Sequence, residues 1–144
     1  MHLDKIDVTG CRLIAAITKE LGMDGPKHHA LVLGKGAFDN EIYLAELMNT
    51  GYQIATFKEF KKRYAANGDI RLEFNNGPNS NEEVVLRAIA ELKQGGAAYD
   101  IVLNNCESYV NRAMHGESSS SQVINTALGV AALIGMVFVL KNLK

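Results

Sequence analysis

The sequence contains no tryptophan, only two prolines and only two cysteines among its 144 residues. So few cysteines exclude a small disulfide-stapled scaffold, and so few prolines exclude a proline-rich linker. Neither sign of charge is in excess, because 15 basic and 16 acidic residues give a formal net charge of −1. Nucleic-acid binding usually needs a basic surplus, so we expect no nucleic-acid partner.

The chain has the length and composition of a single globular domain with a hydrophobic addition at its C-terminus. Hydrophobic residues make up 47% of the sequence, which is enough to build a buried core. We expect a globular domain over residues 1–117, a serine-rich joint over residues 118–122 and a hydrophobic segment over residues 123–144. The N-terminus lacks the basic stretch and apolar run of a secretory signal, so we expect an intracellular protein.

The C-terminal segment carries an uncharged apolar run over residues 127–140. A helix from Ile124 to the end of this run would reach roughly 25 Å, against about 30 Å for the hydrocarbon core of a bilayer. We expect a membrane anchor, with a buried helix or an oligomer contact as alternatives. Small residues recur at Ala127, Ala131 and Gly135, which would let two such helices approach closely and self-associate.

Apolar spacing and helix-breaking residues predict the elements of the globular part. Ser80 and Glu83 form a capping box before an apolar helical face, and Asn104 with Asn105 would cap the last helix. We expect a helix or a strand over 13–21, a strand over 29–33 that forms a tight hairpin with one over 40–47, and a helix over 56–64, for which the aromatic residues leave a strand as the alternative. We further expect a strand over 70–74, a helix over 80–94, an extended stretch over 99–103 and a helix over 106–114.

Cys106 stands out because it begins a predicted helix. Unpaired backbone N–H groups and the helix dipole stabilise a thiolate at this position, and the thiolate is the nucleophile. Cys11 has no such setting. A general base is also needed, and His28 and His29 lie on opposite faces of one strand, so only one of them can face the thiol. His115 lies at the far end of the helix, too distant to act.

Two segments of the sequence resemble the lecithin:retinol acyltransferase-like family of thiol enzymes. The run HHALVLGKG, from His28 to Gly36, is similar to the family's histidine box, in which a tryptophan often follows the histidine. The run YDIVLNNCESYVN, from Tyr99 to Asn111, is similar to its cysteine box. The order of the two boxes, histidine before cysteine, is that of the permuted papain-like, or NlpC/P60, enzymes.

This resemblance implies roles for particular residues. Cys106 matches the nucleophile and His28 matches the base, while His29 is the alternative base. Glu107 and the two asparagines before Cys106 are interpreted as helix caps and supports. The resemblance implies an α+β domain of permuted papain-like type, with an antiparallel sheet and the nucleophile helix packed on it.

The third member of the family's site is a polar residue, often histidine, on the next strand. Residues 37–50 contain no histidine, so this chain departs from the family pattern there. Counting without a gap points to Asn40, matching the surrounding residues points to Tyr43, and Glu41 is a chemical candidate because a carboxylate orients an imidazole well. The sequence does not choose among them. No cofactor or metal is implied, since the sequence lacks the paired ligand motifs typical of zinc sites.

Three functions follow from these observations. The first is a membrane-tethered cysteine acyl hydrolase or acyltransferase, which would act on phospholipid acyl esters through a thioester on Cys106 and whose partners would be a phospholipid membrane and an acyl lipid substrate. The second is a cysteine isopeptidase similar to the desumoylating enzymes, whose box also contains Asn-Asn-Cys. The third is a catalytically degenerate domain that binds a membrane or a protein.

Overall fold

The computed structural model describes residue 3, residues 5–95 and residues 105–116. Within them, three helices accompany a five-stranded sheet, and short 3-10 turns lie at Gly22–Asp24 and Ala65–Asn67. The strands are β1 (Arg12–Ala16), β2 (Lys27–Lys35), β3 (Ile42–Met48), β4 (Gly51–Thr56) and β5 (Arg71–Glu73), and the helices are α1 (Phe57–Tyr64), α2 (Asn81–Gln94) and α3 (Cys106–His115).

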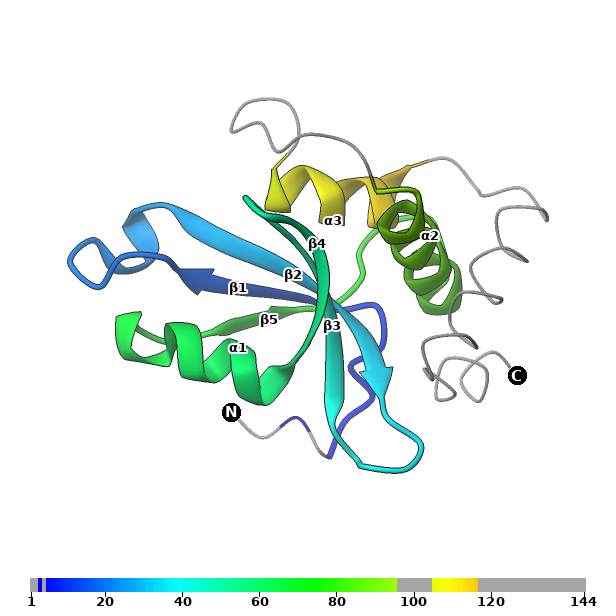
Figure 1. The fold of residues 1–144 in the computed structure, drawn as a ribbon, viewed down its shortest axis with the longest axis horizontal. Coiled ribbons are helices and arrows are strands. Elements are labelled where there is room, and N and C mark those ends of the chain that lie inside the picture. Colours follow the sequence, from blue (N-terminus) through cyan, green and yellow to red (C-terminus); the bar gives the residue numbers. More distant parts are fainter. Residues whose placement is uncertain (1–2, 4, 96–104, 117–144) are drawn as a thin grey trace.

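The sheet has the strand order β4-β3-β2-β1-β5, and every neighbouring pair is antiparallel. Figure 1 shows α1 on one side of this sheet and α2 with α3 on the other. The predicted α+β class, with an antiparallel sheet and the Cys106 helix packed on it, is confirmed. The permuted papain-like assignment stays a prediction at this point.

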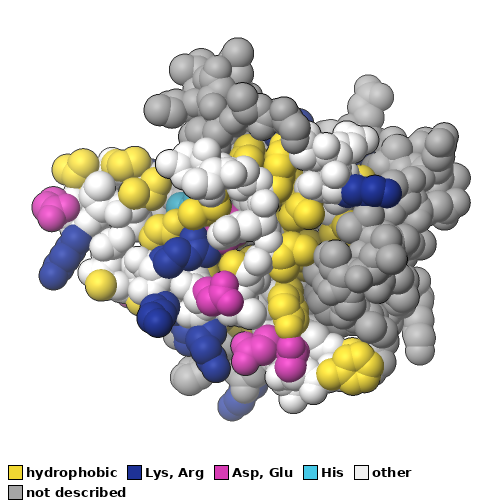
Figure 2. Space-filling model, viewed as in Figure 1, with side chains coloured by type: hydrophobic (Ala, Val, Ile, Leu, Met, Phe, Trp, Pro, Cys, Tyr) yellow, Lys and Arg dark blue, Asp and Glu magenta, His cyan; other side chains and the backbone are white. Residues whose placement is uncertain are grey.

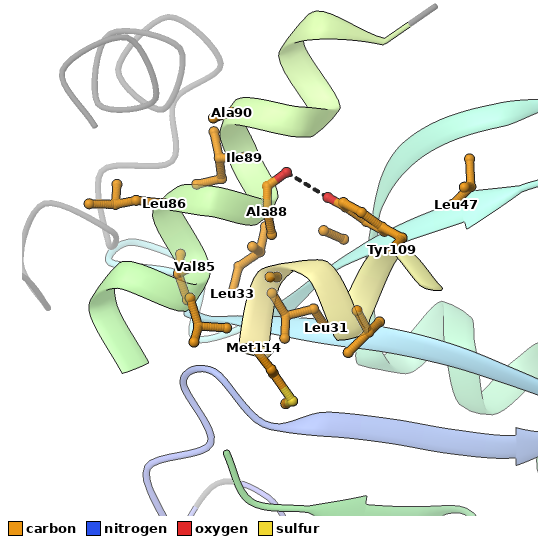
Figure 3. Close-up of a cluster of buried hydrophobic side chains, with 14 residues drawn as sticks. Leu31, Leu33, Leu47, Val85, Leu86, Ala88, Ile89, Ala90, Tyr109 and Met114 are labelled. Carbon is orange, nitrogen blue, oxygen red and sulfur yellow. Dashed lines mark hydrogen bonds between the residues drawn. The ribbon is translucent and has the colours of Figure 1, made fainter. Parts of the chain in front are cut away.

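The two faces of the sheet bury separate apolar clusters, because successive side chains of a strand point to opposite faces. On one face, α2 and α3 cover Leu31, Leu33 and Leu47. Figure 3 shows α2 and α3 meeting here, with Tyr109 of α3 pointing at the backbone of α2. On the other face, Phe57 and Phe60 of α1 pack with alternate residues of β1, β2 and β3. His28 and His29 therefore lie on opposite faces.

Most of the predicted elements are present, with one correction and one omission. Of the two alternatives for the segment 13–21, the strand is confirmed, because its first residues belong to β1, an interior strand whose side chains are all buried. The hairpin after β2 is not tight, since Gly36 donates to the carbonyl of Glu41 across a six-residue loop. The sequence analysis missed β4, a half-buried strand that leads directly into α1.

Side-chain caps fix the starts of the helices, as predicted from the sequence. Ser80 accepts a hydrogen bond from the backbone N–H of Glu83 at the start of α2. At α3 the predicted cap at Asn105 is confirmed, and Asn105 forms a capping box with Ser108. The predicted extended stretch at 99–103, Asn104 and the predicted C-terminal helix lie outside the described residues. Within the described ranges, no helix is both long and apolar enough to cross a membrane.

Tyr109 joins the two helices that cover one face of the sheet. Its hydroxyl donates to the carbonyl oxygen of Ala88 at 2.6 Å, and its side chain is almost fully buried. Tyr109→Phe removes this buried hydrogen bond, while the carbonyl of Ala88 keeps its place in the backbone hydrogen-bond ladder of α2, so we expect the free energy of unfolding to fall by about 0.5–1.5 kcal/mol. Urea unfolding would measure this. Tyr52→Phe removes a half-buried hydroxyl bonded to Glu91 and should cost less; an equal cost for both variants would contradict the argument.

Candidate active site

Cys106 is the first residue of α3, and the backbone around it is fixed by the capping box. Asn105 Oδ1 accepts from the N–H of Ser108 at 3.0 Å, and Ser108 Oγ accepts from the N–H of Asn105 at 2.8 Å. This satisfies one of the donors that a helix start leaves unpaired. The Cys106 sulfur is thereby held in the region where helix N–H groups favour an anion.

The sulfur of Cys106 lies against the edge of β2. Strand β2 pairs with β1 from Lys27 to Leu31, whereas its pairing with β3 runs from Leu31 to Lys35. Cys106 Sγ lies 3.8 Å from the carbonyl oxygen of Lys27 and accepts a hydrogen bond from the backbone N–H of His29. Alternate residues of a strand direct their backbone groups to the same edge, so both contacts come from one side of β2.

His28 and Cys106 form the hydrogen-bonded pair that the sequence analysis predicted as base and nucleophile. The His28 ring is buried, and it packs against Phe60 and Tyr64 of α1 with ring centroids 5.8 and 5.2 Å apart. Its Nε2 lies 2.8 Å from Oε1 of Glu46 on β3. Since Glu46 occupies Nε2, the nitrogen left for exchanging a proton with the thiol is Nδ1.

Glu46 has no exposed surface, and three side chains compensate its buried carboxylate. His28 contacts Oε1, Gln53 Nε2 donates to Oε2 at 2.9 Å, and Arg63 Nη2 lies 2.8 and 2.7 Å from the two oxygens. Burial alone would raise the pKa of Glu46, but these hydrogen bonds outweigh it and hold the pKa below its ordinary value. Glu46 is therefore an ionised acceptor for the imidazole.

The electrostatics of the pair shift the pKa of each group toward its charged form. Burial alone would raise the pKa of Cys106, but hydrogen bonds from His28 and the backbone of His29 lower it overall. Burial alone would lower the pKa of His28, but its bonds to Cys106 and Glu46 raise it overall. By contrast, burial and the charge of Asp7 raise the pKa of Cys11 to about 11, so that thiol stays protonated at neutral pH.

His29 lies on the opposite face of the sheet and contacts a different set of side chains. Its Nδ1 is 3.3 Å from Arg12 Nη1, and its Nε2 is 3.6 Å from Oε2 of Glu107. Arg12 also donates to Asn111 of α3. Burial and the positive charge of Arg12 lower the pKa of His29 to about 4, so its ring is neutral at pH 7. His29 thus contributes its backbone N–H to Cys106, while its side chain ties α3 to β1.

The three residues proposed as third member from the sequence do not contact His28. Asn40 lies in the β2–β3 loop with a left-handed φ of 58°. The hydroxyl of Tyr43 donates to Asp39, and the carboxylate of Glu41 lies 3.6 Å from Lys58 Nζ. The structure instead brings Glu46 to His28, a residue that the sequence analysis did not consider.

A sequence signal for Glu46 did exist. It is the only charged residue of the strand IYLAELM, and a lone carboxylate in an otherwise apolar strand needs a buried partner. Glu41, the carboxylate that the sequence analysis named as a candidate third residue, lies earlier in the chain than Glu46. Among the described residues, no three histidine, cysteine, aspartate or glutamate side chains gather so as to hold a metal ion.

The comparison with known families agrees with the sequence motifs. A family model described as lecithin retinol acyltransferase matches residues 24–119, which is 96 of the 144 residues and includes His28, Glu46 and Cys106. No curated protein and no solved structure matches this chain.

The Cys106–His28 contact predicts how the thiol reacts. His28→Ala removes the hydrogen bond that lowers the pKa of Cys106, so we expect alkylation of Cys106 at pH 6 to slow about tenfold or more. Peptide-resolved mass spectrometry after timed iodoacetamide treatment would measure this. Cys11 serves as an internal control because it should react slowly in both proteins. Equal Cys106 rates in both would refute the pairing.

His29 predicts a loss of stability in acid. An unfolded histidine binds a proton near pH 6.5, whereas folded His29 does so only near pH 4. The unfolded state therefore binds more protons in this window, so the free energy of unfolding falls as pH drops from 6.5 to 4, by about 3 kcal/mol at most. Urea unfolding between pH 4.5 and 7 would measure the slope. His29→Gln should flatten it, and an unchanged slope would contradict this account.

Proposed function

Because the chain belongs to the lecithin retinol acyltransferase family, we propose that it is a cysteine-dependent acyl hydrolase or acyltransferase acting on phospholipid acyl esters. The observation that carries the proposal is the contact of Cys106 with His28, backed by Glu46 at 2.8 Å from the far side of the ring. A nucleophile, a base and an orienting carboxylate from three separate elements meet in one buried cluster. This is the arrangement that covalent acyl transfer needs.

The first half of the proposed reaction forms a thioester. The Cys106 thiolate attacks the carbonyl carbon of the acyl ester, and the carbonyl oxygen becomes an oxyanion. Backbone N–H groups in the first turn of α3 would stabilise that oxyanion. The tetrahedral adduct then collapses, the bond to the leaving oxygen breaks, and the His28 imidazolium gives its proton to the departing alcohol.

The second half regenerates the thiol. Neutral His28 takes a proton from water, or from the hydroxyl or amine of an acceptor, which attacks the thioester carbonyl. The carbon–sulfur bond breaks and the thiolate is restored beside the imidazolium. Glu46 keeps the ring oriented through both halves, because it accepts the hydrogen bond from Nε2. Water as acceptor gives hydrolysis, and a lysolipid or amine gives transfer.

The hydrophobic residues 127–140 fit this proposal as a tether. An anchor near the domain would keep the site at the surface that contains its lipid substrate and would raise the effective concentration. The tether and the lipid substrate belong to the proposal and are tested with it.

The decisive experiment looks for the acyl group on Cys106. We would add the full-length protein to mixed phospholipid vesicles and follow released fatty acid together with the intact mass of the protein. We expect an acyl adduct that is absent in Cys106→Ala, and fatty-acid release that falls at least about a hundredfold in both Cys106→Ala and His28→Ala. Cys11→Ser is the matched control, since it changes the other thiol and should retain activity.

Two other results would replace the proposal. If no fatty acid is released while Cys106 still alkylates rapidly, cleavage of an isopeptide substrate becomes the function to test. If Cys106 reacts no faster than a free thiol, the domain is a binding module that has kept the family fold.

A further inference from the structure

The negative charge of the buried Glu46 carboxylate must be compensated by the groups around it. Its side chain has no exposed surface, and an uncompensated buried charge is strongly unfavourable. The charged and titratable groups that face it, within the described residues, are His28 from β2, Arg63 and Tyr64 from α1 and, through His28, Cys106 from α3. Gln53 of β4 donates but carries no charge. Arg63 is thus the permanent positive charge among these groups.

Arg63 is held in a defined position against Glu46. One of its terminal nitrogens lies 2.8 and 2.7 Å from the two carboxylate oxygens. The guanidinium also stacks over Tyr64 and Phe60, with its central carbon 5.0 and 5.7 Å from the ring centroids. The same two rings pack against His28. One turn of α1 therefore contacts both the base and the carboxylate behind it.

We propose that Arg63 is a positioning residue for the reaction: it keeps Glu46 ionised, and through Glu46 it supports the charged form of His28. The role rests on the proposed function, because it matters only if His28 and Cys106 exchange a proton during turnover. Arg63 itself does not touch the sulfur or the substrate. The side chain of Arg63 is 29% exposed, so a replacement side chain at this position would still contact water.

The geometry makes a prediction about pH. Without Arg63, Glu46 loses its strongest donors and takes up a proton in mildly acidic solution, and a neutral carboxyl no longer stabilises the imidazolium. The Cys106 thiolate, which depends on that imidazolium, is then lost at a higher pH than in the natural protein. Above that pH range Glu46 ionises again, and Cys106 should be equally reactive in the wild-type protein and in the protein without Arg63.

The test is the pH profile of Cys106 alkylation in the full-length protein, read by peptide-resolved mass spectrometry. We expect Arg63→Met to move the acid limb upward by about one pH unit, so that Cys106 reacts about tenfold more slowly than wild type at pH 5.5 and within about twofold of it at pH 8. Arg63→Lys, which keeps the charge but loses the planar fork, should fall between the two.

Lys62→Met is the matched control. Lys62 is an exposed neighbour on the same helix, and Figure 2 shows several Lys and Arg side chains exposed over this part of the molecule. Removing its charge changes the net charge as Arg63→Met does, but it should leave the profile unchanged. An equal shift in both variants would assign the effect to general surface charge and overturn the role of Arg63.

A double variant separates action through Glu46 from a structural effect of Arg63. Glu46→Gln removes the charge that Arg63 compensates, so adding Arg63→Met to it should change the alkylation profile by less than about twofold. Because this double variant has no unpaired buried charge, its alkylation profile can be measured even if Arg63→Met alone does not fold. If Arg63→Met slows Cys106 as strongly in the Glu46→Gln background as in wild type, the proposal fails.

The outcomes also distinguish this inference from the proposed function. If wild-type Cys106 is reactive and releases fatty acid but Arg63→Met leaves the acid limb in place, the positioning role fails and the function stands. If wild-type Cys106 is no more reactive than a free thiol, both fail together.

Discussion

The buried carboxylate of Glu46 is the interaction on which the site depends. It lies in β3 with no exposed surface, and its donors come from three other elements: His28 of β2, Gln53 of β4 and Arg63 of α1. A charge in this position is tolerated only while those donors are in place. The packing of α1 on the sheet, the β3–β4 register and the orientation of the His28 ring therefore all depend on keeping this buried carboxylate compensated.

That requirement connects the two faces of the sheet. Glu46, His28 and Arg63 belong to the face covered by α1, whereas Cys106 belongs to a helix that packs on the opposite face. They meet because β2 pairs with β3 only from Leu31 onward, which leaves the backbone of Lys27 and His29 available to the start of α3. The position of the Cys106 sulfur is therefore set by where two strands stop pairing.

The sequence predicted those features that depend on short segments. Local signals placed the start of α2 at Ser80 and the start of α3 at Cys106, and alternation along β2 put His28 and His29 on opposite faces. The motif that contains Cys106 and the one that contains His28 were enough to suggest the family. Each of these signals lies within about a dozen residues, and capping and alternation are local in their physical cause.

What the sequence did not predict depends on contacts between distant segments. Glu46 was missed because its partner on α1, Arg63, is 17 residues away in the chain and reads as one more basic residue of an amphipathic helix. The strand β1 was ambiguous because an interior strand buried on both faces has no alternation to mark it. β4 was missed because its residues, mostly half-buried, show no clear apolar pattern.

The two adjacent histidines of β2 lie in opposite electrostatic environments. Hydrogen bonds with Cys106 and Glu46 raise the pKa of His28 despite its burial, while His29, one residue on, is kept neutral by burial and by Arg12. The backbone N–H of His29 nevertheless contacts the sulfur of Cys106, so any shift of β2 would disturb His28 and Cys106 together. The Arg12 network that ties α3 to β1 through His29 and Asn111 therefore constrains the position of Cys106 as well as the fold. In this domain the geometry of the Cys106–His28 pair follows from the way α3 is fixed to the strands beneath it.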